Sequence, residues 1–207
     1  MSKALLDTAI QAALLAGEKI MAIYNNEEIA VQQKADDSPL TQADVASHHI
    51  ILKALAATKI PVLSEEGRAI PYAERKHWER LWLVDPIDGT KEFIKRNGEF
   101  TVNIALVENQ KPIMGVIYAP VLGDLYFSSA GLGAFKINIE ASNFESLEAL
   151  IDQAQLLPQN HDLDTYTIVA SRSHRNTATE TFISQLEQEH QNIQTIAVGS
   201  SLKLCMV

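Results

Sequence analysis

The chain has 207 residues, of which 46% are hydrophobic and 21% charged, a composition typical of folded globular proteins and not of disordered ones. Its formal net charge of −9 argues against general attraction to nucleic acid or anionic membranes. No apolar run approaches the roughly 20 residues that span a bilayer, and the amino terminus lacks a signal peptide's apolar core. We expect a cytoplasmic protein without a transmembrane segment or a nucleic-acid partner, and leave peripheral association with the inner membrane open.

The first predicted elements are two helices. Apolar side chains recur at spacings of three and four over residues 3–24, which is typical of an amphipathic helix, and Gly17 within it indicates a close contact. The polar stretch 32–39 breaks this periodicity and predicts a loop. A second helix is predicted over residues 41–58. Its first threonine acts as the cap, and Asp44 lies in the first turn, where a carboxylate favours the helix dipole.

Two short apolar runs follow and predict buried strands that end in carboxylates. Residues 61–64 lead into Glu65 and Glu66, and residues 81–84 lead into Asp85. Because successive side chains of a strand point to opposite faces, only one of the two glutamates should reach a site shared with Asp85.

A series of antiparallel strands is predicted next. Apolar residues alternate over 100–107, and after a polar turn a further strand over 112–119 completes a hairpin. Shorter strands are predicted at 125–127 and 134–139. Two helices followed by such strands indicate an α+β layer, which we assign to a first domain over residues 1–142.

The remaining residues, 143–207, are predicted to begin a second domain. After a polar stretch, their pattern alternates as strand (166–170), helix (177–189), strand (193–198) and the start of a helix from Ser201. Strands alternating with helices are typical of a parallel α/β unit. The second domain is therefore expected to be α/β and incomplete.

The most specific motif is Asp85-Pro86-Ile87-Asp88-Gly89-Thr90. Proline fixes a turn at a strand end, so two carboxylates three positions apart can converge there. Oxygen-only ligands of this kind select hard cations such as magnesium. Gly89 lets a ligand approach the backbone closely, and Thr90 is expected to begin a helical turn whose free N–H groups can bind phosphate.

An ordinary structural interpretation exists for each of these residues. Most Asp-Pro and Asp-Gly pairs belong to turns and caps, and Asp44 could serve only as a first-turn acid. The full motif is far more specific, because five fixed positions at roughly 5% usage each recur by chance in on the order of one chain in ten thousand. The pattern therefore favours a functional site.

The motif resembles the signature of the inositol monophosphatase superfamily, an Asp-Pro-(Ile/Leu)-Asp-Gly-(Thr/Ser) turn with a glutamate upstream, supplied here by Ser64-Glu65-Glu66. Segments 34–44, 82–100, 171–174 and 199–203 are most similar to its bacterial 3′(2′),5′-bisphosphate nucleotidase branch. The resemblance extends over essentially the whole chain. It implies a layered αβαβα sandwich whose C-terminal part is truncated here.

Residue roles follow from this resemblance alone. It implies roughly two or three Mg²⁺ ions, with metal ligands from Glu65, Asp85, Asp88 and the Ile87 carbonyl. Asp44 and Thr90 would position and deprotonate the attacking water. The family pattern selects Glu65 over Glu66. The residues implied to bind substrate are Glu65, Ile87, Asp88, Gly89, Thr90, His174, Ser200 and Lys203.

The leading functional hypothesis is a magnesium-dependent phosphomonoesterase that hydrolyses the 3′-phosphate of adenosine 3′,5′-bisphosphate, with the sulfated nucleotide as a further candidate. A place in sulfur metabolism and lithium sensitivity are implied by resemblance only. Lys91-Glu92-Phe93 and Ser171-Arg172-Ser173-His174 favour the nucleotide. An inositol monophosphatase or sugar-bisphosphatase, or a non-catalytic metal or nucleotide binder, remains an alternative. The oligomeric state is not set by the sequence.

One family feature is missing from the sequence. Family members carry a Trp-Asp-x-Ala-Ala-Gly segment whose aspartate is the last metal ligand. Neither Trp78 nor Trp82 precedes an aspartate in this chain. We therefore expect either a truncation of a longer protein or a degenerate copy with impaired catalysis.

Overall fold

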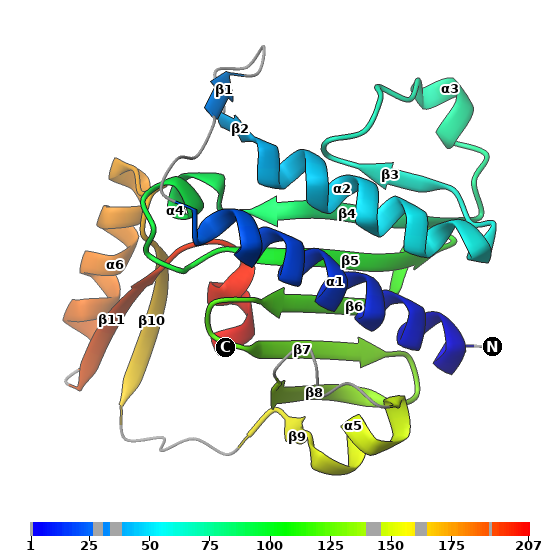
Figure 1. The fold of residues 1–207 in the computed structure, drawn as a ribbon. Helices are drawn as coiled ribbons and strands as arrows, with labels where there is room; N and C mark the ends of the chain where they lie inside the picture. Colours follow the sequence, from blue (N-terminus) through cyan, green and yellow to red (C-terminus); the bar gives the residue numbers. More distant parts are fainter. Residues whose placement is uncertain (1, 27–30, 34–38, 140–145, 160–164, 191) are drawn as a thin grey trace.

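The computed structural model describes residues 2–26, 31–33, 39–139, 146–159, 165–190 and 192–207 (Figure 1). Most of the predicted loop at 32–39 and the predicted domain boundary at 142/143 lie outside the described residues. None of the described helices is long and apolar enough to cross a membrane. The elements are α1 (Ser2–Tyr24), β1 (Val31–Gln33), β2 (Pro39–Thr41), α2 (Gln42–Leu55), η1 (Ala56–Thr58), β3 (Val62–Ser64), α3 (Tyr72–Arg75), β4 (Arg80–Asp88), α4 (Thr90–Ile94), β5 (Thr101–Glu108), β6 (Lys111–Ala119), β7 (Asp124–Ser129), β8 (Gly133–Asn138), α5 (Leu147–Gln153), β9 (Gln155–Leu157), β10 (Tyr166–Ser171), α6 (Thr177–Glu189), β11 (Ile193–Val198) and η3 (Ser201–Met206).

A mixed sheet forms the centre of the molecule, with the strand order β3-β4-β5-β6-β7-β8-β9. Only β3 and β4 pair in parallel; every other pair in this sheet is antiparallel. The predicted hairpin is confirmed as β5 and β6. Its turn places Asn109 and Gln110 at φ angles of 49° and 65°, the positive values that a tight hairpin turn requires at both central residues.

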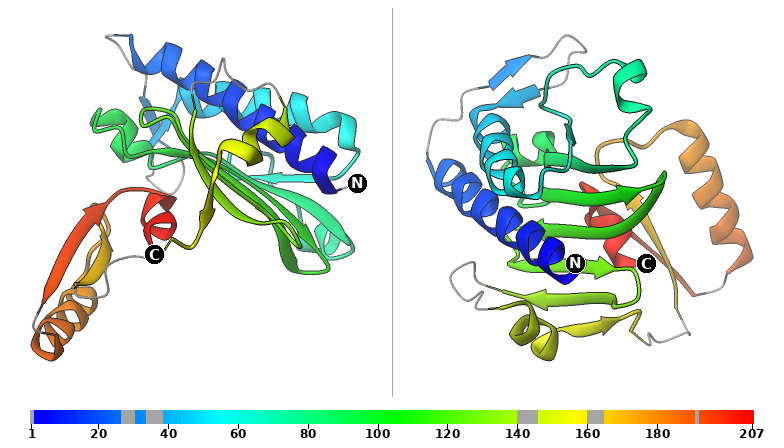
Figure 2. Two further views of the ribbon diagram at one scale, coloured as in Figure 1. Left: turned by 90° about the horizontal axis from the view of Figure 1, so that it is seen from below. Right: turned by 90° about the vertical axis from the view of Figure 1, so that its right-hand side faces the viewer.

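Helices α1 and α2 lie side by side on one face of this sheet (Figures 1 and 2). Both helices were predicted from their apolar periodicity, and Thr41 caps α2 as expected. The buried face of α1 includes Leu6, Ile10 and Ile20, which are fully inaccessible to solvent and belong to the same core as Trp82. Each large apolar side chain buried in this way contributes about 1.5–3 kcal/mol relative to exposure, so this interface stabilises the sheet.

A smaller unit follows in the chain, made of β10, α6 and β11. The two strands pair in parallel, with Tyr166 opposite Ile193, and the helix lies between them in sequence. This confirms the predicted strand-helix-strand pattern. Val198 and Leu202 from this end of the chain form a second small core with Ala119 of the large sheet. The layered α/β fold with a mixed sheet is therefore confirmed.

The predicted division at 142/143 differs from the arrangement of elements that follow it. Helix α5 buries Leu147 and Leu150 in the main core, and β9 pairs with β8 at the edge of the large sheet. Neither element was predicted, because both are short and lie in a stretch whose composition is polar. Among the described elements, β10 is therefore the first that belongs to the smaller unit.

Gly17 provides a test of packing between α1 and the sheet. A Cβ atom on Gly17 would lie 2.3 Å from Cε1 of Tyr118, a buried side chain of β6. Overpacking of this kind costs about 1–3 kcal/mol, more than the gain of about 1 kcal/mol in helix propensity. Gly17→Ala should therefore lower the urea midpoint of unfolding.

The matched control for this prediction is Leu15→Ala in the same helix, because the Leu15 side chain is 51% exposed. It should change the unfolding free energy much less than Gly17→Ala does. A Gly17→Ala protein as stable as the unmodified chain would contradict the tight contact.

Candidate active site

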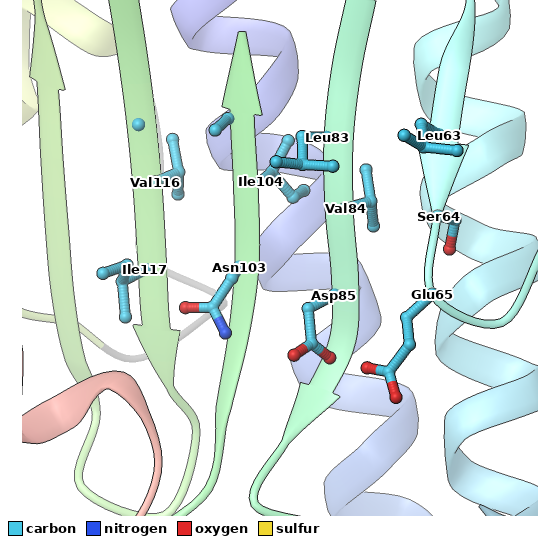
Figure 3. Close-up of a pocket in the computed structure, with 12 residues that line it drawn as sticks. Leu63, Ser64, Glu65, Leu83, Val84, Asp85, Asn103, Ile104, Val116 and Ile117 are labelled. Carbon is cyan, nitrogen blue, oxygen red and sulfur yellow. The ribbon is translucent and has the colours of Figure 1, made fainter. Parts of the chain in front are cut away.

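Two carboxylates come together where β3 ends beside Asp85 of β4. The parallel register pairs Ser64 with Val84, so the next residues along each strand, Glu65 and Asp85, are neighbours. The Glu65 N–H donates to the Val84 carbonyl at 3.0 Å, which holds the two strand ends together. Figure 3 shows both carboxylates side by side and directed the same way. They lie at one end of a hollow of about 590 Å³ on the sheet face opposite α1 and α2.

The Asp-Pro-Ile-Asp segment does not end the strand in a turn, as predicted, but forms an irregularity within it. Strand β4 continues to Asp88, and its register with β5 shifts between Asp85 and Asp88. A bulge tolerates Pro86, which has no N–H to donate to a ladder. The Pro86 carbonyl accepts a hydrogen bond from Ser47 Oγ of α2 at 2.9 Å. The bulge therefore shifts Asp88 out of the regular register of the strand, and the hydrogen bond from Ser47 attaches the bulge to α2.

Asp44 sits at the start of α2 with its side chain directed toward this bulge. One carboxylate oxygen accepts from the Thr41 N–H at 2.8 Å and from the Thr41 hydroxyl, which confirms the predicted capping role. The other oxygen accepts from the Thr90 hydroxyl at 3.2 Å, and this hydroxyl also lies 3.3 Å from the Ile87 carbonyl. Burial raises the pKa of Asp44, although hydrogen bonds from Thr41 and Thr90 act in the opposite direction.

Among the described carboxylates of the site, Asp85 is the one whose pKa is raised the most. Its Oδ1 atom is buried and has no hydrogen-bond partner among the described residues. Burial, followed by the nearby charges of Glu65 and Asp88, raises the pKa of Asp85 to about 8. A buried anionic oxygen beside other carboxylates is unfavourable unless a cation neutralises it. The donor set therefore fits a hard divalent cation.

Asp88 lies somewhat apart from this pair. Burial raises its pKa, whereas nearby Lys203 and a hydrogen bond from the Ser201 backbone lower it. As arranged in the described parts of the chain, no three His, Cys, Asp or Glu side chains are grouped to hold a metal ion. The structure thus brings Glu65 and Asp85 together, while Asp88 is held from the Lys203 side.

A cleft of about 200 Å³ opens beside the bulge and contains residues from both units of the chain. Every residue predicted to bind substrate lines it except Ile87, whose side chain is buried in the core. The lining is formed by Pro39, Glu65, Asp88, Gly89, Thr90, Lys91, Glu92, Ser171, His174, Gly199, Ser200 and Lys203.

Some of these lining residues were not predicted to form part of the site. Lys91 follows Thr90 directly, and its Nζ lies 3.4 Å from His174 Nε2. Glu92 and Gly199 are packed at the back of the cleft. Lys91 and Glu92 belong to a segment that favoured the nucleotide branch, so adjacency to the motif was the available signal. The contact between Lys91 and His174 depends on tertiary folding, so it could not be predicted from the spacing of residues in the sequence.

Backbone conformation explains why two positions beside the cleft carry small residues. Gly89 has φ +94°, and a Cβ there would lie 3.1 Å from the Glu99 carbonyl and 3.2 Å from Ser200 Cβ. Glycine is therefore needed both for the angle and for the space. Ser200 also has a positive φ of 49°, uncommon for a residue with a side chain, and its carbonyl accepts from Lys203 Nζ.

Comparisons with known proteins agree with this geometry. The sequence matches the inositol monophosphatase family over residues 1–207. It is 45% identical to the 3′(2′),5′-bisphosphate nucleotidase CysQ of Shigella flexneri over 206 residues, covering 98% of this chain and 76% of that protein. The crystal structure of CysQ from Bacteroides thetaiotaomicron is similar, with 48% identity, a TM-score of 0.86 and coverage of 97% and 74% of the two chains. The extragenic suppressor protein suhB of Bartonella henselae has a TM-score of 0.74 at 27% identity, with coverage of 99% and 74%. The chain therefore belongs to the inositol monophosphatase family.

Proposed function

We propose that this chain is a magnesium-dependent 3′(2′),5′-bisphosphate nucleotidase, which converts adenosine 3′,5′-bisphosphate to AMP and phosphate. The observation that carries the proposal is the Glu65–Asp85 carboxylate pair, next to a cleft with basic side chains. Within this pair, Asp85 Oδ1 is buried and has no hydrogen-bond partner among the described residues. The identity to CysQ proteins supports the choice of nucleotide. A cytoplasmic location and a role in sulfur metabolism belong to the same proposal.

Glu65, Asp85, Asp88 and the Ile87 carbonyl would hold the metal ions. When bound, Mg²⁺ supplies Lewis-acid activation of water and charge stabilisation on the transferred phosphoryl group. The hydroxyl of Thr90 donates to Asp44, so its lone pairs are free to accept a proton from an attacking water molecule. Asp44 holds the hydroxyl in this orientation and can take up the proton. The Asp44–Thr90 pair would thus position and deprotonate water.

Basic side chains in the cleft suit a second phosphate. Lys91, His174 and Lys203 all line the cleft, whereas the protein as a whole has a net charge of −9. Lys91 Nζ lies 3.4 Å from His174 Nε2, so one dianionic group would be within reach of both side chains. The cleft therefore favours a substrate with two separated phosphates, and the sulfated relative of the nucleotide is a further candidate.

The direct test is phosphate release from adenosine 3′,5′-bisphosphate with Mg²⁺. Asp88→Asn or removal of the metal with a chelator should lower kcat/KM at least about 100-fold, because transition-state charge is no longer stabilised. The matched control is Asp152→Asn, an exposed aspartate on α5 that does not line the cleft. Equal activity in the Asp88→Asn protein would contradict the proposal.

Two alternatives share the metal-binding motif and are separated by the same assay. Faster turnover of inositol 1-phosphate or of a sugar bisphosphate than of the nucleotide would favour an inositol monophosphatase or a sugar-bisphosphatase. Tight nucleotide binding by calorimetry, without turnover, would favour a non-catalytic binder. Lithium inhibition is expected for all the catalytic members by resemblance.

Replacing Asp85 should have two opposite effects: higher stability without metal, and loss of the stabilisation that metal provides. Without metal, Asp85→Asn should raise the free energy of unfolding by about 1 kcal/mol or more, because it removes a carboxylate whose ionised form is disfavoured by burial and by the charges of Glu65 and Asp88. The folded-state pKa of about 8 lies above the ordinary value of 3.8, so the unfavourable contribution of Asp85 grows as the pH rises between these values. The gain should therefore be larger at pH 8 than at pH 5.

The same variant should lose the rise in Tm that Mg²⁺ gives the unmodified protein. Urea unfolding in EDTA and thermal unfolding with increasing Mg²⁺ measure the two effects, with Asp152→Asn as control. Stabilisation of Asp85→Asn by Mg²⁺ to the same extent as the unmodified chain would exclude Asp85 as a ligand.

A further inference from the structure

Glu99 lies between the large sheet and the smaller unit, just before β5 begins. Its carboxylate accepts two hydrogen bonds from the Arg172 guanidinium, from Nε and Nη2, each at 2.7 Å. The same carboxylate accepts the Gly199 N–H at 2.8 Å. Its side chain is only 21% exposed, and the hydrogen bonds from Arg172 hold the pKa of Glu99 below its usual range. Planar, two-point contacts of this kind fix orientation as well as distance.

The two groups that Glu99 binds belong to the segments that carry the basic residues of the cleft. Arg172 follows β10 and stands two positions before His174, while Gly199 follows β11 and stands four positions before Lys203. Arg172 also donates to the Ala197 carbonyl at 2.5 Å, so both segments are tied to one carboxylate. Movement of either segment would therefore require breaking the Glu99 contacts.

Close packing reinforces this arrangement. A Cβ on Gly199 would lie 2.6 Å from Cγ of Glu92 and 3.0 Å from the Glu99 carbonyl, so the backbone at 199 rests directly against α4 and the residues before β5. Glu92 is buried and accepts a hydrogen bond from Ser173 Oγ, next to His174. Glu99 itself does not line the cleft. It can therefore affect a bound ligand only through the segments that it holds.

We infer that Glu99 is a positioning residue that sets the separation between the Asp88–Thr90 end of the cleft and the basic side chains His174 and Lys203. This inference rests on the proposed function, in which one end takes the scissile phosphate and the other end takes the second phosphate. The separation of the two ends then selects substrates with two phosphates over those with one. Glu99 contributes to this choice without touching either phosphate.

The test measures KM and kcat of the Glu99→Gln protein and of the unmodified protein with two substrates, adenosine 3′,5′-bisphosphate and adenosine 3′-monophosphate. Glutamine keeps the size of the side chain but removes the charge that binds Arg172. For the bisphosphate, KM should rise about tenfold with kcat nearly unchanged, as expected for loss of ground-state binding. For the monophosphate, KM and kcat should change less than about twofold, since no second phosphate is bound.

Matched variants separate positioning from general loss of stability. Glu108→Gln breaks another glutamate–arginine pair, with Arg80, at the far end of β5 and should leave both KM values unchanged. Arg172→Gln should reproduce part of the Glu99→Gln effect, and the double variant should be no worse than Glu99→Gln alone. Equal loss of kcat on both substrates, with unchanged KM, would overturn the inference.

Hydrogen exchange gives a readout that does not depend on turnover. Backbone amides in segments 171–174 and 199–203 should exchange faster in Glu99→Gln than in the unmodified protein, and not in Glu108→Gln. If the unmodified chain released no phosphate from either nucleotide, the proposed function would fail, and exchange alone would decide whether Glu99 holds the two segments. Unchanged exchange in both segments would refute the positioning role.

Discussion

The parallel pairing of β3 with β4 is the constraint on which the candidate site depends. It is the only parallel pair among the described strands of the large sheet, and its register places Glu65, which follows β3, beside Asp85 of β4. In an antiparallel pair, Glu65 and Asp85 would lie at opposite edges. Burial, followed by the nearby charges of Glu65 and Asp88, raises the pKa of Asp85. A group of carboxylates that is electrostatically unfavourable by itself is suited to a divalent cation, because the cation supplies the positive charge that neutralises them.

The cleft is formed by two parts of the chain that contribute different chemical groups. The bulge of β4 and the start of α4 bring carboxylates, a hydroxyl and a glycine, whereas the ends of β10 and β11 bring basic side chains. Two buried or half-buried glutamates, Glu92 and Glu99, connect the parts through hydrogen bonds to Ser173, Arg172 and Gly199. Some acidic residues of this protein therefore serve to hold the basic part of the cleft in place.

Sequence patterns predicted the long elements well and the irregular ones poorly. Helices α1 and α6 and the hairpin of β5 and β6 have strong periodicity, because each buries one face against a neighbour. Elements α5 and β9 have only seven and three residues, so no period could develop. At the site, the sequence predicted Asp88 as a metal ligand with Glu65 and Asp85, but it gave no sign of the hydrogen bond from the Ser201 backbone or of the nearby charge of Lys203. Contacts made across about a hundred positions of sequence, such as Glu99 with Gly199, follow from the folded chain alone.

The Asp44 carboxylate accepts hydrogen bonds from both Thr41 and Thr90, and this affects how such a site would be lost during evolution. Its carboxylate caps α2 and also receives the Thr90 hydroxyl, so losing it weakens the helix as well as the site. Asp85 is the opposite case, because its buried oxygen has no partner among the described residues. A lineage freed from selection for turnover, yet still selected for folding, would discard Asp85 early and retain Asp44 long afterwards. The presence of both residues in this chain is therefore more informative about continued selection than the presence of Asp44 alone.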